Sequence, residues 1–156
     1  MKKKDLTPAR EALVKKTREL DEKLKKITDP KDVPGALAEE GQRGVTLSEY
    51  INVLLDQKNM TAAQAIAGSN LSAGYANNII NGSREKPSRD KVIALSFGLK
   101  ATPEEADRLL KLAGHSPLYS RSSRDGIILV CLREGKSLMR CEEILDEFRL
   151  GLIGAE

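Results

Sequence analysis

Residues 61–81 combine two short helical segments with a tight turn between them, and this pattern restricts the fold more than any other feature of the chain. The signals are Thr61 and Ser72 as N-cap residues, Ser69-Asn70 as the turn, and Asn81-Gly82 as the helix stop. A hydroxyl oxygen can accept a hydrogen bond from the free amides of a first helical turn. Asparagine tolerates the left-handed backbone that a tight turn needs. The segment therefore predicts a helix-turn-helix unit.

The flanking sequence predicts further helices and no strand. Helical spacing of apolar residues continues over 47–57 and 89–99, and Thr102-Pro103-Glu104-Glu105 is a strong helix start that leads to a stop at Gly114. The chain has no tryptophan and only 3% aromatic residues, so its core has to be built from Leu, Ile, Val and Ala. This composition favours helices over a β-sandwich, and we predict an all-α fold.

The last third of the chain repeats the helical pair that precedes it. Ser88-Arg89-Asp90 recurs as Ser123-Arg124-Asp125, an offset of 35, and the apolar positions that follow also match. The run IILVCL looks β-like by composition, but its place in the repeat predicts a helix. We therefore expect a C-terminal helical hairpin in residues 119–156, after a helix-turn-helix domain in residues 47–118.

The N-terminal residues 1–27 form a basic amphipathic segment with ten basic and five acidic side chains. Leu6, Leu13, Leu20 and Ile27 lie seven residues apart, which leaves two alternatives: a helix that docks on its own domain, or a helix that pairs with a second copy. Residues 28–46, with Pro30, Pro34, Gly35, Gly41 and Gly44, predict a linker that holds at most a short helix.

Several function classes are disfavoured by composition. No run of 18 apolar residues occurs, and the basic N-terminus lacks the apolar region of a secretory signal, so we expect a cytoplasmic protein that does not enter membranes. Cys131 and Cys141 are expected to be reduced, structural thiols. With one histidine, no nucleophile–base pair, no glycine-rich phosphate loop and no metal ligand set, we expect neither an enzyme nor a bound metal or cofactor.

The sequence resembles a known family of regulators. From residue 47 it reads LSEYINVLLDQKNMTAAQAIAGSNLSAGYANNIINGSREKPSRDKVIALSFGL. This is similar to the lambda-repressor-like, Cro-type helix-turn-helix family, also called the XRE family, and more narrowly to a branch common in low-GC Gram-positive bacteria. The narrower likeness depends on GSREKPSRD at residues 82–90 and LLKLAGHSPLYSRSSRD at residues 109–125. It covers roughly residues 28–150 and implies a five-helix core with a C-terminal two-helix extension; the predicted N-terminal helix lies outside the resemblance.

The resemblance also implies a function, that of a sequence-specific DNA-binding transcriptional regulator. A recognition helix over about 72–81 would enter the major groove of double-stranded DNA, and a homodimer would be needed because one helix reads too few bases. The implied DNA contacts are Thr61 before the recognition helix, then Ser72, Ala73, Gly74, Asn77 and Asn78 on it, and Asn81, Ser83, Arg84, Lys86 and Arg89 after it. Asparagine amides can read adenine.

Two alternatives remain open at this point. Arg89 and Asp90 are equally consistent with an internal ion pair or cap, because the same pair recurs at Arg124 and Asp125. The whole chain is also consistent with a protein-interaction adaptor that has lost base readout. Ala73 and Gly74 cannot make bidentate bonds to a base, Ile80 is expected near the surface, and the C-terminal helices offer a docking face.

Overall fold

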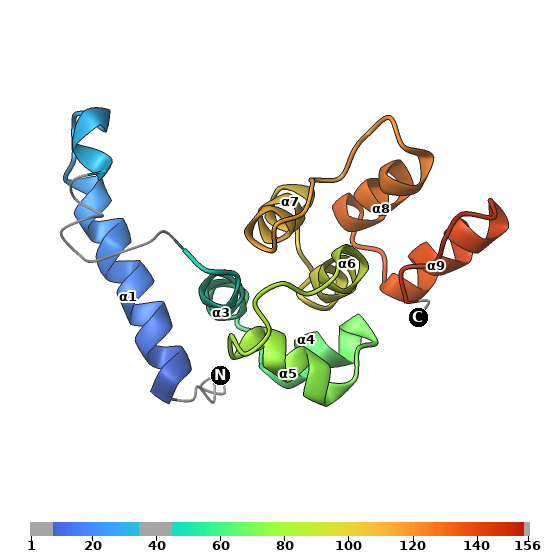
Figure 1. The fold of residues 1–156 in the computed structure, drawn as a ribbon, viewed down its shortest axis with the longest axis horizontal. Coiled ribbons are helices and arrows are strands. Elements are labelled where there is room, and N and C mark those ends of the chain that lie inside the picture. The colour runs from blue at the N-terminus through green and yellow to red at the C-terminus, as the bar shows by residue number, and fades with distance from the viewer. Residues whose placement is uncertain (1–7, 35–44, 155–156) are drawn as a thin grey trace.

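The computed structural model describes residues 8–34 and 45–154, which form eight α-helices and one short 3-10 helix joined by loops (Figure 1). In chain order these are α1 (Pro8–Lys25), η1 (Pro30–Asp32), α3 (Leu47–Gln57), α4 (Ala62–Ser69), α5 (Ala73–Ile80), α6 (Arg89–Gly98), α7 (Pro103–Leu112), α8 (Ser123–Arg133) and α9 (Leu138–Glu147). The described ranges contain no strand. The prediction of an all-α fold is confirmed, and residues 127–132 are helical.

Helix starts follow the caps that the sequence predicts. The hydroxyl of Thr61 accepts from the Gln64 amide at 3.1 Å, while the Gln64 side chain accepts from the Thr61 amide at 2.9 Å. Thr102 and Glu105 form the same reciprocal pair at the start of α7. Each pair satisfies two amide donors that have no partner inside a helix. The predicted caps therefore fix where α4 and α7 begin.

The core is organised around α6, whose residues from Val92 to Gly98 are all buried. Helix α4 packs closely against α6, with α7 on another side (Figure 1). The approach of α4 depends on glycine, because a Cβ on Gly98 would fall directly onto the Ala65 carbonyl oxygen, and one on Gly68 would lie 3.1 Å from the Gly98 Cα. Sequence periodicity predicts one apolar face for this helix, whereas the structure buries it on all sides.

The pair α8–α9 repeats the pair α6–α7, and the boundaries of α9 lie 35 residues after those of α7. The left-handed positions repeat as well: Lys100 corresponds to Gly135, and Gly114 to Arg149. Burial differs between the copies. Leu95 is 2% exposed, whereas Val130 at the equivalent position is 43% exposed, because the first pair lies between neighbours and the second lies at the end of the chain.

The two copies exchange ion pairs. Arg89 donates two hydrogen bonds to Asp125, at 2.8 and 3.1 Å, and Arg124 donates to Asp90 at 3.1 Å. Burial acts to raise the pKa of Asp125, but the bonds from Arg89 and from the Tyr119 amide, with the charges of Arg89 and Arg124, outweigh it and lower that pKa. The repeated Arg-Asp pair thus joins two helical pairs that follow one another in the chain.

The ends of the chain pack on this core in different ways. Helix α1 lies against α3, where Arg18 pairs with Asp56, so the tail helix docks on its own chain as the first alternative predicts (Figure 1). The thiols of Cys131 and Cys141 are buried and free between α8 and α9, and burial raises the pKa of Cys141. Leu6, the side chain of Leu13 and linker residues 35–44 lie outside the described residues.

Candidate functional site

The turn between α4 and α5 sets the direction in which α5 leaves the core. Asn70 ends α4 in the left-handed conformation, with a φ of 57°. The hydroxyl of Ser69 donates to the Ile66 carbonyl at 2.8 Å and accepts from the Leu71 amide at 3.2 Å, so the turn is held from both sides. The Ser72 hydroxyl then accepts from the Tyr75 amide at 3.3 Å and starts α5. This turn and cap agree with the sequence prediction.

Helix α5 has one buried face and one exposed face. Ala76, Ile79 and Ile80 are buried, while the opposite face exposes all five of its nominated residues, Ser72, Ala73, Gly74, Asn77 and Asn78. The side-chain amides of Asn77 and Asn78 have no hydrogen-bond partner within the residues that the structure describes. These amides are therefore available to a molecule that approaches the exposed face.

The C-terminal end of α5 is attached to α3 through one carbonyl group. The Ile80 carbonyl accepts from the Ser48 hydroxyl at 2.6 Å and from the Asn52 amide at 3.0 Å. The expectation that Ile80 lies near the surface is wrong, since this side chain is 7% exposed and belongs to the core. The reason is that α3 covers this end of α5, a contact that helix spacing alone does not reveal.

The loop after α5 folds back on the helix. The Arg84 amide donates to the Asn78 carbonyl at 2.9 Å, and the Asn81 side chain accepts from the Ser83 amide at 2.8 Å. Gly82 has a φ of +90°, a conformation that glycine adopts without steric cost. Asn81, Ser83, Arg84 and Lys86 are all exposed, so the loop extends the exposed surface of α5.

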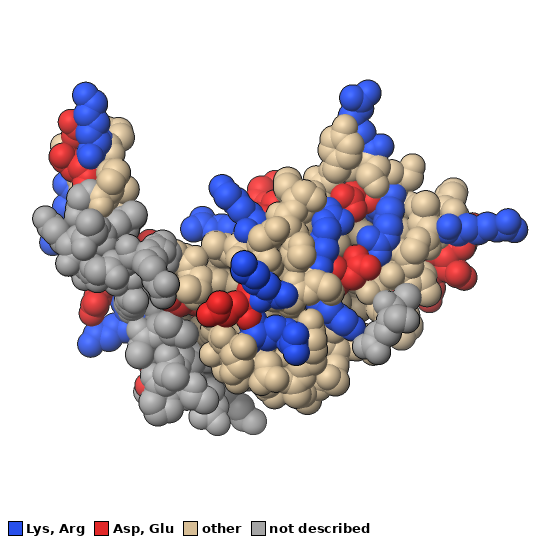
Figure 2. Space-filling model, in the orientation of Figure 1, with Lys and Arg blue, Asp and Glu red and all other residues tan. Residues whose placement is uncertain are grey.

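Two cations flank the ring of Tyr75. The Arg84 guanidinium carbon lies 4.7 Å from the ring centroid and the Lys91 ammonium lies 5.6 Å from it, distances typical of cation–π contacts. Figure 2 shows lysine and arginine side chains over the area where the α5–α6 loop runs in Figure 1, with acidic side chains beside them. The surface next to α5 is therefore basic, with acidic side chains interspersed.

The other nominated residues are placed differently. Thr61 is half-buried, and its hydroxyl accepts within the capping pair. Arg89 directs its guanidinium inward: besides Asp125, it donates to the carbonyls of Ser116 at 3.3 Å and Pro117 at 3.0 Å. The ion-pair alternative is therefore right for Arg89, although its partner is Asp125 and not its neighbour Asp90.

The role of Tyr75 as a platform for cations is not evident from the sequence. Its spacing from Leu71 and Ile79 predicts a core residue, whereas the structure leaves it half-buried with two cations in contact with its ring. The sequence signal that indicates such a platform is an aromatic residue one turn after a helix N-cap, here Tyr75 after Ser72, followed by an arginine in the loop after the helix, here Arg84. We define the α5 surface as Ser72, Ala73, Gly74, Asn77 and Asn78 together with Asn81, Ser83, Arg84, Lys86 and Lys91.

The α5 surface carries hydrogen-bonding amides, hydroxyls and cations, which suit a polar and anionic partner. Among the described residues, no group of three or more His, Cys, Asp or Glu side chains is arranged to hold a metal ion. No helix in the described ranges is long and apolar enough to cross a membrane. No family model, no curated protein and no solved structure matches the chain.

Proposed function

We propose that the chain is a sequence-specific DNA-binding regulator of the lambda-repressor-like helix-turn-helix type, with residues 47–118 as its five-helix core. The observation that carries this proposal is the exposed face of α5, where two unpaired asparagine amides lie beside a capped helix start and a basic loop. The partner is double-stranded DNA, bound by a homodimer in the cytoplasm. We leave Arg89 out of the binding surface because its donors are used within the chain.

In this proposal, the parts of the α5 surface have different tasks. The free amides at the start of α5 and the side chains of Arg84 and Lys86 bind phosphates, which gives affinity without sequence preference. Asn77 and Asn78 donate to and accept from base edges in the major groove, where an amide pairs with adenine. Ala73 and Gly74 allow the helix backbone to come close to the bases, and Ala73 can contact a thymine methyl group.

The first test selects duplexes from a random-sequence library with the full chain. We expect enrichment of a motif with two related half-sites about 10 base pairs apart, because a dimer places two recognition helices one helical turn apart. Fluorescence anisotropy then measures affinity for the selected duplex. A library that yields no motif, with equal affinity for all duplexes, would contradict the proposal.

Phosphate contacts predict a specific change in salt dependence. The double substitution Arg84→Gln and Lys86→Gln is expected to reduce the slope of log affinity against log salt by about two, because each lost cation releases one fewer counterion. The matched control is Arg121→Gln with Arg133→Gln, which removes two exposed cations outside the α5 surface. An equal reduction of the slope in both double variants would show that overall charge, and not this surface, drives binding.

Base reading predicts a loss confined to one position of the site. Asn77→Ala is expected to cost about 1–3 kcal/mol of binding on the selected duplex and much less on duplexes altered at the base pair that it reads. Gln57→Ala, an exposed amide at the end of α3, serves as the control. The same loss on every duplex would assign Asn77 to phosphate binding and not to base reading.

One observation favours a second candidate function, that of a protein-interaction adaptor. The C-terminal pair exposes large apolar side chains: Val130 is 43% exposed, Met139 73% and Phe148 66%. Exposed apolar groups of this size are frequent at protein interfaces. The buried position of Ile80 removes one argument for this alternative. If duplex DNA binds weakly and without sequence preference, the adaptor becomes the better interpretation.

A further inference from the structure

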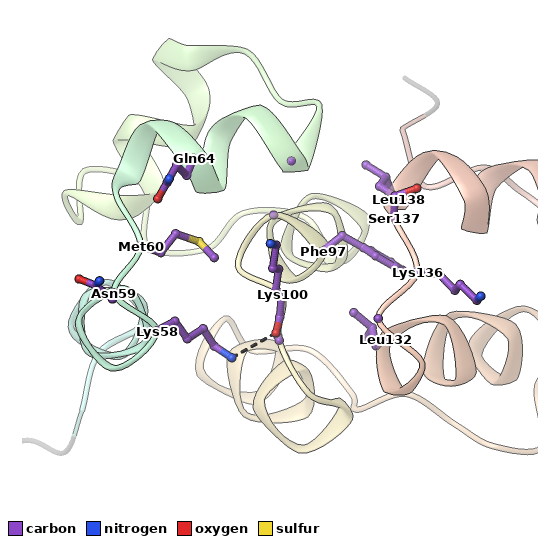
Figure 3. A pocket seen from close by; sticks show the side chains of 14 residues that line it. Lys58, Asn59, Met60, Gln64, Phe97, Lys100, Leu132, Lys136, Ser137 and Leu138 are labelled. Carbon is purple, nitrogen blue, oxygen red and sulfur yellow. Dashed lines mark hydrogen bonds between the residues drawn. The ribbon is translucent and has the colours of Figure 1, made fainter. Parts of the chain in front are cut away.

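A cavity of about 690 Å³ opens between α4 and α6 on one side and the C-terminal pair α8–α9 on the other (Figure 3). It lies on a different part of the molecule from the α5 surface. Its walls come from the α3–α4 loop, α4, the end of α6 with the loop after it, and the turn from α8 into α9. None of the predicted functional residues lines this cavity. We call it the α4–α9 cavity.

One wall of the α4–α9 cavity is apolar. It is formed by Met60, Phe97, Leu132 and Leu138, and each of these side chains is at most 8% exposed. The few exposed atoms of these side chains line the cavity. A compact apolar group bound against them would therefore be shielded from water. Burial of apolar area contributes roughly 25 cal/mol per Å². The cavity therefore suits a ligand with an apolar body.

The cavity is lined by three lysines, Lys58, Lys100 and Lys136, and by no acidic residue. Figure 3 shows Lys100 extending toward α4, with Met60 on one side and Phe97 on the other. The Lys100 ammonium has no hydrogen-bond or ion-pair partner among the described residues. The Gln64 carbonyl oxygen accepts from the Thr61 amide, which leaves the Gln64 NH₂ group as a donor.

The other two lysines have different roles. Lys58 donates to the Lys100 carbonyl at 3.1 Å and pairs with Glu105 at 2.9 Å, so its charge is compensated within the protein. Lys136 extends away from the other labelled side chains (Figure 3). Lys100 is thus the lysine whose side chain extends across the cavity (Figure 3). We therefore expect a bound anion to contact the Lys100 ammonium group.

The backbone at Lys100 makes this side chain unusual. Its φ is 51°, the left-handed region, and the equivalent residue of the second copy is Gly135, with a φ of 69°. A glycine is the least strained residue at such a position. Replacement of Lys100 by glycine therefore removes the ammonium group while it relieves backbone strain, and it keeps the carbonyl that accepts from Lys58.

We propose that the α4–α9 cavity binds a small organic anion, namely a carboxylate with a compact aromatic or branched apolar body. The carboxylate accepts from the Lys100 ammonium and the Gln64 NH₂ group, and the apolar body lies against Met60, Phe97 and Leu138. The proposal does not depend on DNA binding. It gives the chain a ligand site with walls from both α4 and the turn before α9.

The test uses the full chain and two probes of the same shape, phenylacetate and its neutral amide, phenylacetamide. Amide shifts in NMR spectra are followed during titration to about 10 mM, a range that detects weak binding. We expect saturable shifts for phenylacetate at the cavity residues and about tenfold weaker binding of phenylacetamide. Lys100→Gly is expected to weaken phenylacetate binding about tenfold and to leave the melting temperature unchanged or higher.

Lys111→Ala, which removes a lysine that does not line the cavity, is the control and is expected to bind phenylacetate as the unaltered chain does. Several results would overturn the proposal. These are equal affinity for the two probes, unchanged phenylacetate affinity in Lys100→Gly, shifts concentrated outside the cavity, and no saturable shift with phenylacetate. An equal loss of affinity in both lysine variants would also overturn it, since overall charge would then explain binding.

Discussion

Gly98→Ala is expected to lower the free energy of unfolding by about 3 kcal/mol, which is a large part of the total stability of many domains. The added Cβ would fall onto the Ala65 carbonyl oxygen and lie 3.0 Å from the Ser69 Cβ. Both atoms are fixed, because one is backbone and the other is attached directly to it. Helix α4 would have to move away from α6, and the close packing between them would be lost. Urea unfolding followed by circular dichroism measures the change.

Gly74→Ala is the matched control for this prediction. Gly74 is also helical, but no atom lies within 4 Å of a Cβ built there. Alanine has the higher helix propensity, so we expect this variant to be as stable as the unaltered chain or more stable, by up to about 1 kcal/mol. Equal losses in the two variants would show that the tight crossing of α4 and α6 does not limit stability.

Asp125→Asn is expected to destabilise the chain by roughly 3 kcal/mol, because it leaves the Arg89 guanidinium without its carboxylate in a buried location. The Asp125 side chain is 9% exposed and accepts two hydrogen bonds from Arg89 and one from the Tyr119 amide. The repeat provides the control. Asp90 accepts one hydrogen bond from Arg124 and is 39% exposed, so Asp90→Asn is expected to cost less than about 1 kcal/mol.

The same carboxylate predicts how stability changes in acid. The folded pKa of Asp125 is lower than the unfolded value of 3.8. Its contribution is therefore complete above the unfolded pKa and is lost as the pH falls through 3.8 toward the folded pKa. Urea midpoints measured between pH 7 and pH 3 are expected to fall less steeply in Asp125→Asn. Identical acid profiles for the variant and the unaltered chain would contradict this assignment. Glu105, whose pKa is also lowered, keeps its contribution in both.

Much of the helical structure could be predicted from local signals in the sequence. Thr61, Ser72 and Thr102 act as caps where expected, and Asn70 adopts the left-handed turn. The offset of 35 correctly assigned residues 127–132 to a helix, although their composition favours a strand. These features succeed because a cap or a turn depends on a few neighbouring residues and not on the rest of the fold.

Features that depend on contacts between helices could not be predicted. The repeat shows two Arg-Asp pairs, but not that each arginine reaches the aspartate of the other copy. The sequence predicts Ile80 near the surface, whereas α3 covers it in space. The α4–α9 cavity combines residues from four segments of the chain, and Lys100 stands out only when its backbone angle is known.

The hydrogen bonds from Ser48 and Asn52 to the Ile80 carbonyl have a consequence for molecular recognition. They attach the C-terminal end of α5 to α3, so the orientation of the outer face of α5 is restrained relative to α3 before a partner arrives. Little conformational entropy remains to be lost on the protein side when a partner arrives. A partner that binds this face would therefore have to change its own conformation. A stiff partner whose curvature does not match the face would bind weakly because of its shape alone.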